Sequence, residues 1–78
     1  MHRASGDGDA ALSSAIRMIR IDPYRAEFRE LAAAIAIEQG ALEEARLQIE
    51  ALVLLEPDRD IHQQRLEAIM RLIERSGE

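Results

Sequence analysis

The chain has 78 residues, a net charge of −5 and no cysteine. This length allows one small domain, and the lack of cysteine excludes disulfides, thiolate metal sites and cysteine nucleophiles. The excess of acidic over basic residues argues against a nucleic-acid partner, because phosphate binding needs a surplus of positive charge.

The N-terminal region divides into a lead-in and a first helix. Residues 1–8 (MHRASGDG) are small, polar and rich in glycine, and they predict a disordered lead-in before a helical domain at 9–76. The first helix is expected from about Ala10 to Ile21, with Asp9 as its N-cap. Its apolar residues lie on one broad face, so this helix should pack on one side only.

Asp22 and Pro23 predict the start of a second helix, as an acidic N-cap followed by proline at the first helical position. This helix is expected to run to about Gln39, and Gly40 should end it in the left-handed conformation. A stripe at helical spacing marks its expected core face: Tyr24, Phe28, Leu31 and Ile35.

The third helix is predicted from Leu42 to Leu55. Apolar residues lie on two of its sides, which predicts a helix sandwiched between neighbours and the most buried element. The two faces are Leu42, Ala45, Ile49, Leu52 and Val53, and Leu47, Ala51, Leu54 and Leu55.

A fourth helix follows the break at Glu56-Pro57-Asp58 and is predicted from about Arg59 to Arg75. We expect its core-facing residues to be Leu66, Ile69, Met70 and Ile73, and we expect Ile61 and Leu72 to be exposed beside them.

An internal repeat links these helices. Residues 18–23 (MIRIDP) parallel residues 52–57 (LVLLEP) at an offset of 34. A helix-hairpin unit of this length needs small residues where its helices cross, a glycine at the inner turn and a proline before the next unit. Those roles are filled by Ala33, Ala45, Gly40 and Pro57.

In these residues the chain resembles the tetratricopeptide repeat family. The resemblance is carried by Leu31-Ala32, Gln39-Gly40, Glu44-Ala45, Ala51-Leu52 and Glu56-Pro57, whereas Arg29, Ala36, Ile49 and Leu52 depart from the family pattern. It implies an all-α fold of four antiparallel helices in a short right-handed superhelix, with one full repeat and two half repeats. The alternative is a plain four-helix bundle in which the proline spacing is a coincidence.

The resemblance also implies a non-catalytic module for protein–protein interaction, with a concave side that holds a peptide or helix. The residues carried over to that side are Glu27, Glu30, Ala34, Ile37, Glu38, Ile61, Gln64, Ala68 and Arg71. Their mostly negative charges favour a basic or amphipathic segment as the partner. The other interpretation is that these acids form a solvated helix face. Family members that grip a carboxylate use Lys and Asn, and this chain has neither.

No catalytic, metal or cofactor motif stands out. His62 lacks further ligands at helical spacing and is interpreted as a surface histidine. Asp7-Gly8-Asp9 begins like a calcium loop, but Met18 stands where the loop needs a bidentate acid. We therefore expect no enzyme activity, no metal and no cofactor.

Two alternatives to an independent interaction module stay open. The chain is also compatible with a structural tail of a larger multidomain protein, possibly an enzyme, or with a small secretion-type chaperone. Apolar faces at the ends of a repeat stack need a cover, which predicts homo-oligomers. The longest apolar run, 31–37, is too short to cross a bilayer, and residues 1–6 lack the apolar segment of a signal peptide, so we expect a cytoplasmic protein without membrane contact.

Overall fold

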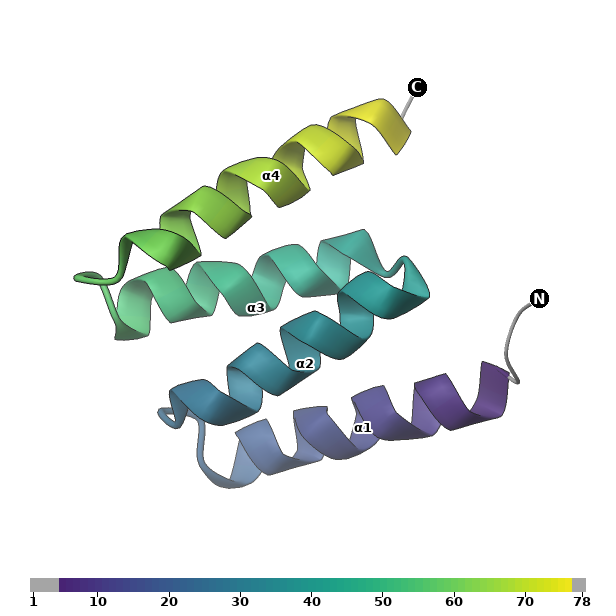
Figure 1. Ribbon diagram of the computed structural model, residues 1–78. Helices are drawn as coiled ribbons and strands as arrows, with labels where there is room; N and C mark the ends of the chain where they lie inside the picture. Colours follow the sequence, from purple (N-terminus) through teal and green to yellow (C-terminus); the bar gives the residue numbers. More distant parts are fainter. Residues whose placement is uncertain (1–4, 77–78) are drawn as a thin grey trace.

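The computed structural model describes residues 5–76, and the side chains of residues 10–76. Over this range the chain forms four α-helices and no strand, as predicted (Figure 1). The helices are α1 (Ser5–Ile21), α2 (Ala26–Gln39), α3 (Leu42–Leu55) and α4 (Asp60–Ser76).

The four helices form one layer in chain order. Each helix runs antiparallel to the preceding one and packs on its chain neighbours, α1 on α2, α2 on α3 and α3 on α4 (Figure 1). Within residues 5–76, α1 and α4 make no contact, and the molecule measures 38 × 34 × 15 Å. A closed four-helix bundle needs its first and last helices to meet, so this arrangement is an open stack of helix hairpins.

The first helix begins earlier than the sequence predicts. Residues 1–4 of the predicted lead-in lie outside the described residues, whereas residues 5–8 belong to α1. The predicted start near Ala10 is therefore wrong, and Asp9 lies inside the helix. Glycine lowers helix propensity by about 1 kcal/mol without forbidding the helix, so the glycines at 6 and 8 are a weak stop signal. One-sided packing of α1 is confirmed, with Ala15 and Ile19 buried.

The two Pro-containing connections have the same geometry. The N–H of Arg25 donates to the carbonyl of Asp22 at 3.2 Å, and the N–H of Arg59 donates to the carbonyl of Glu56 at 3.0 Å. Each bond closes a four-residue turn with proline at its second position, where the fixed φ of proline fits. The helices therefore begin after the turns. The predicted starts of α2 at Pro23 and of α4 at Arg59 come three residues and one residue too early.

This turn also explains the exposure of Tyr24. The sequence predicts Tyr24 in the core stripe of the second helix. In the structure Tyr24 is 80% exposed, because it lies in the turn before that helix. Of the same stripe, Phe28 and Ile35 pack against the buried residues shared by α1 and α2, whereas Leu31 is 45% exposed.

Gly40 ends α2 as predicted, with φ of +77°. Its N–H donates to the carbonyl of Ile37 at 3.1 Å, and the N–H of Ala41 donates to that of Ala36 at 2.8 Å. These two bonds are the Schellman arrangement, which satisfies carbonyls that the helix end leaves without partners. The reversal brings α3 back along α2.

The core is aliphatic and continuous from α1 to α4. One cluster joins α1 and α2, and a second joins α2, α3 and α4. Alanines at the helix crossings are completely buried, which lets the backbones approach closely: Ala32, Ala36 and Ala45. In α4, Leu66, Ile69 and Ile73 belong to this core, whereas Met70, predicted to join them, is 46% exposed.

Helix α3 lies between α2 and α4, as predicted, but only one of its apolar faces is buried. The buried residues are Ala45, Gln48, Ile49 and Leu52. On the second predicted face, Leu47 and Leu54 are 51% and 82% exposed. In an open layer both neighbours approach α3 along the same stripe, and nothing covers the opposite side within the described residues. None of the helices in residues 5–76 is both long and apolar enough to span a bilayer.

Candidate functional site

A groove of about 370 Å³ lies between α2, α3 and α4. Its lining residues are Glu30, Ala33, Ala34, Ile37, Ile49 and Arg65. Ile49 of α3 is almost completely buried and closes the groove from below, while two small alanines of α2 leave space above it. The groove lies where α2 and α4 flank α3 without contacting each other closely.

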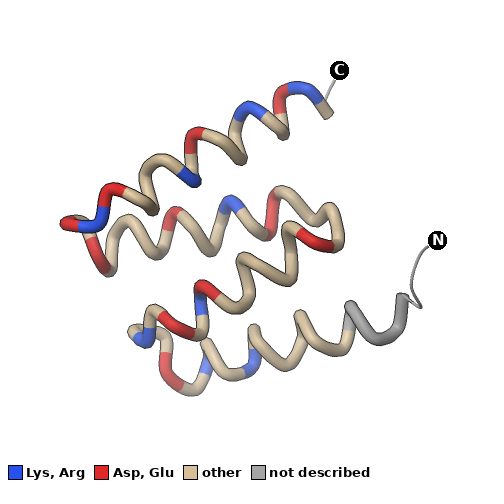
Figure 2. The backbone as a smooth tube through the Cα atoms, viewed as in Figure 1, with Lys and Arg blue, Asp and Glu red and all other residues tan. Residues whose placement is uncertain are grey.

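The walls of the groove carry opposite charges. Helix α2 contributes the carboxylate of Glu30, and α4 contributes the guanidinium of Arg65. Along α4 acidic and basic residues alternate, α3 carries three acids and one arginine, and the described charges of α1 are two arginines (Figure 2). The groove therefore offers an apolar floor between one acidic and one basic side chain.

The structure brings three of the nine predicted partner-binding residues together in this groove, namely Glu30, Ala34 and Ile37. The other six do not line the groove, and all of them are exposed: Glu27, Glu38, Ile61, Gln64, Ala68 and Arg71.

Three lining residues were not predicted to bind a partner, namely Ala33, Ile49 and Arg65, and of these only Arg65 is exposed. It follows Ile61 by four residues and precedes Ala68 by three, so it shares their helix face. This spacing in the sequence is sufficient to assign Arg65 to the same face as the predicted residues.

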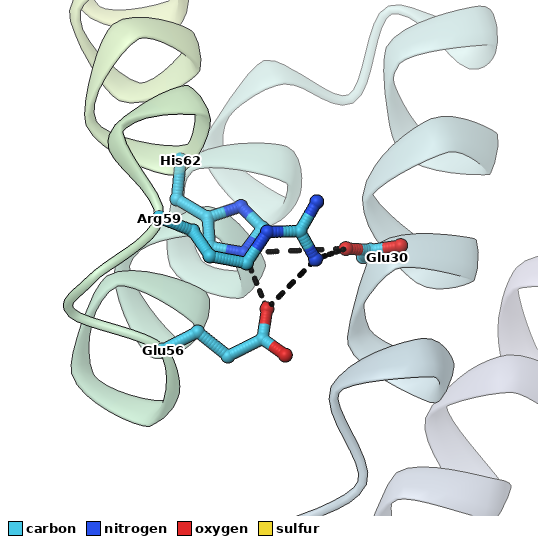
Figure 3. Close-up of polar contacts among 4 residues, drawn as sticks. All are labelled: Glu30, Glu56, Arg59 and His62. Atoms are coloured by element: carbon cyan, nitrogen blue, oxygen red, sulfur yellow. Dashed lines mark hydrogen bonds and ion pairs between the residues drawn. The ribbon is translucent and has the colours of Figure 1, made fainter.

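A second polar cluster lies where α2 meets the α3–α4 turn (Figure 3). The Nε2–H of His62 donates to Oε1 of Glu56 at 2.7 Å, and Nε2 lies 4.0 Å from Oε2 of Glu30. The Nη1 atom of Arg59 lies 3.4 Å from the same oxygen of Glu56 and 3.8 Å from that of Glu30. The cluster thus joins α2, the turn and α4.

The interpretation of His62 as a surface histidine is wrong, since its side chain is completely buried. The internal repeat contains the missed signal, because His62 follows Phe28 by the repeat offset of 34. An aromatic ring at this position of the preceding unit predicts burial of the imidazole. The partner of His62 is Glu56 in the turn.

Glu56 is held in its charged form. The hydrogen bond from His62 lowers the pKa of Glu56 most strongly, partial removal from water opposes this shift, and the charge of Arg59 adds to the lowering. The cluster therefore presents an ionised carboxylate next to a buried imidazole.

The comparison with known families agrees with three features of this fold. They are the helix hairpins at a 34-residue offset, the small residues at the helix crossings and the glycine at the inner turn. A sequence model of the tetratricopeptide repeat family matches residues 2–69. The chain belongs to the tetratricopeptide repeat family. No curated protein and no solved structure gives a significant match.

In tetratricopeptide repeat terms, α2 and α3 form the complete unit, with α1 and α4 as half units before and after it. The groove lies on the side where the first helices of successive units, α2 and α4, face each other across α3. Repeats of this family generally mediate protein–protein interactions and use such concave surfaces for binding.

Proposed function

We propose that this tetratricopeptide repeat chain binds a basic or amphipathic helical segment of a partner protein in the groove between α2, α3 and α4. The observation that carries the proposal is the apolar floor between Glu30 and Arg65. An amphipathic helix fills such a groove with apolar side chains and places its polar residues against the rims.

Charge selects the partner and its orientation. Exposed acids at 27 and 38 flank Glu30 on α2, so this side of the groove favours a basic residue of the partner. Arg65 and Arg71 on α4 favour an acidic residue on the opposite side. A peptide that presents both signs in the matching order should bind better than its charge-reversed counterpart.

Apolar contact supplies the second part of the affinity. Ile37 is 43% exposed, and Ala34 is exposed next to it, so apolar surface is available for burial by a ligand. The floor is short, which suits two or three apolar side chains from successive turns of one helix.

The test uses a fluorescein-labelled amphipathic peptide of Leu, Ala and Arg, measured by fluorescence anisotropy, with an otherwise identical peptide that carries Glu instead of Arg. We expect saturable binding of the basic peptide, which weakens as salt concentration rises. The double variant Ile37→Glu with Ala34→Arg should abolish it.

The matched control is Leu54→Glu, which changes an 82% exposed apolar residue of α3 that is not part of the groove lining. This variant should bind like the unchanged chain. Equal binding of the two peptides, or undiminished binding by the double groove variant, would refute the groove assignment.

Self-association through α4 is a second proposal, supported by the exposure of Met70 and Leu72 at 46% and 42%. Analytical ultracentrifugation should show a concentration-dependent dimer that Met70→Glu with Leu72→Glu converts to a monomer. A monomer at all concentrations would remove this proposal. The structural tail and the secretion-type chaperone stay predictions from the sequence.

A further inference from the structure

Three potential metal ligands converge from α2, the α3–α4 turn and α4. They are Glu30, Glu56 and His62, and one ligand atom of each lies within 4.8 Å of the other two. We propose that Nε2 of His62 and one carboxylate oxygen from each Glu bind a single Zn²⁺ ion. This site shares Glu30 with the groove, but its ligand and its test differ from those of the proposed peptide binding, so either proposal can fail alone.

The spacing of the donor atoms fits a tetrahedral ion after small carboxylate rotations. Ligand atoms at zinc distances lie ~3.3–3.6 Å apart in a tetrahedron. From Nε2 of His62, the observed separations are 2.7 Å to Glu56 and 4.0 Å to Glu30, on either side of that value. The two carboxylates are about one-third exposed and free to adjust, whereas burial holds the imidazole in place. Water would complete the coordination from the exposed side.

The imidazole itself points to a ligand. Phe28 fills the equivalent position of the preceding unit, so packing alone is satisfied by an apolar ring. His62 is completely buried, yet its Nδ1 atom has no hydrogen-bond partner among the described residues. By contrast, the buried Gln48 is bonded to Arg29 at 3.0 Å and to Glu44 at 2.7 Å. An ion at Nε2 would leave Nδ1 unpaired, so what points to a ligand is Nε2 itself, which lies next to both carboxylates at a position where the preceding unit has an apolar ring.

Arg59 is the cation that balances the two carboxylates when no ion is bound. Its side chain is 54% exposed, and its distances to Glu56 and Glu30 are long for an ion pair, at 3.4 and 3.8 Å. Ion pairs of such exposed side chains are weak, so Arg59 can turn into solvent at small cost. A divalent ion would then be neutralised by two carboxylates without any rearrangement of the backbone.

The donor set selects the class of ion. One imidazole nitrogen and two carboxylate oxygens favour Zn²⁺ over Mg²⁺ or Ca²⁺, which prefer oxygen alone. When the ion binds, the ring proton moves from Nε2 to Nδ1, where it meets no acceptor among residues 10–76. Because this outer hydrogen bond is missing, we expect affinity about 10–100-fold below that of a comparable site that has one.

The test is titration of the full chain with ZnCl₂ in a calorimeter, with helicity of each variant checked by circular dichroism. We expect saturable binding of one ion. His62→Phe should remove it while keeping the ring that the repeat position accepts, and Glu30→Gln should weaken it more than tenfold. His2→Ala removes the other histidine and should leave binding unchanged. MgCl₂ should give no saturable heat.

Arg59→Ala distinguishes a metal site from a purely structural ion-pair network. If Arg59 competes with the ion, its removal should strengthen Zn²⁺ binding, whereas a network without an ion gains nothing from that change. The proposal is overturned if the unchanged chain shows no saturable binding, if His62→Phe binds as well as the unchanged chain, or if Arg59→Ala weakens binding. Should His62→Phe fail to fold, the Glu30 and Arg59 variants decide by the same criteria.

Discussion

Phe28 and His62 occupy the same position of successive repeat units and differ in how they are held. Phe28 is partly buried against α1, and the guanidinium carbon of Arg25 lies 5.2 Å from the centre of its ring. His62 is completely buried, and the corresponding Arg59 contacts the carboxylate that accepts the hydrogen bond of the imidazole. One position of the repeat thus holds an apolar ring in one unit and a polar ring in the next.

This relationship predicts which part of His62 stabilises the fold. His62→Ala should lower the free energy of unfolding by about 2–5 kcal/mol, because it empties a buried site and removes the hydrogen bond to Glu56. His62→Phe should lose less than half as much, because a ring still fills the space. Urea unfolding of the metal-free chain measures the two values. Equal losses would show that the hydrogen bond, and not the packing of the ring, dominates.

The end of α2 predicts a cost that comes from the backbone alone. Gly40→Ala should lower the free energy of unfolding by about 1–2 kcal/mol, since a residue with a Cβ atom disfavours the left-handed conformation. No heavy atom lies within 4 Å of the added Cβ, so no clash contributes. Gly40→Asn is the control and should lose less, because asparagine adopts this conformation more easily. A thermal melt in which alanine and asparagine have equal effects would contradict this account.

The one-sided burial of α3 predicts that two leucines of this helix contribute very differently to the free energy of unfolding. Leu52→Ala should lower the free energy of unfolding by about 2–5 kcal/mol, because Leu52 is completely buried. Leu54→Ala should stay within about 0.5 kcal/mol of the unchanged chain, because Leu54 is 82% exposed. Chemical denaturation of both variants checks the pair. A large loss for Leu54→Ala would mean that this face is covered in solution, for instance by a second copy.

The close approach of α2 and α3 predicts the effect of added volume. Ala36→Leu should destabilise the fold by about 1–3 kcal/mol, since Ala36 is completely buried within the core shared by α2, α3 and α4. Ala34→Leu adds the same side chain two residues earlier, but into the open groove, and should change the stability by less than about 0.5 kcal/mol. Melting temperatures compare the two. Similar losses would contradict the placement of the crossing at Ala36.

The features that could be predicted from the sequence are those decided by one local rule or by the repeat. Gly40 ends α2 because glycine alone enters the left-handed region without strain, and the bounds of α3 follow from that stop and from Pro57. The 34-residue offset led to the hairpin architecture and to three of the groove residues, Glu30, Ala34 and Ile37.

The errors arise where one pattern is compatible with two structures. An acidic residue before proline suits both a helix N-terminus and the first half of a turn, and the turn formed at Pro23. Apolar residues on two sides of α3 indicate two covered faces only if the layer closes around the helix, and this layer is open. The lack of further ligands at helical spacing led to the surface interpretation of His62, whereas the repeat position that it shares with Phe28 accounts for its burial.

Glu30 belongs to two places at once, because its carboxylate lines the groove and also lies 4.0 Å from Nε2 of His62. A single carboxylate cannot pair fully with a basic residue of a groove ligand and with an ion at His62 at the same time. The two proposed binding events must therefore oppose each other, and thermodynamic linkage makes the opposition equal in both directions. Zinc would then act as a negative effector of peptide capture, through one side chain and without any movement of the helices.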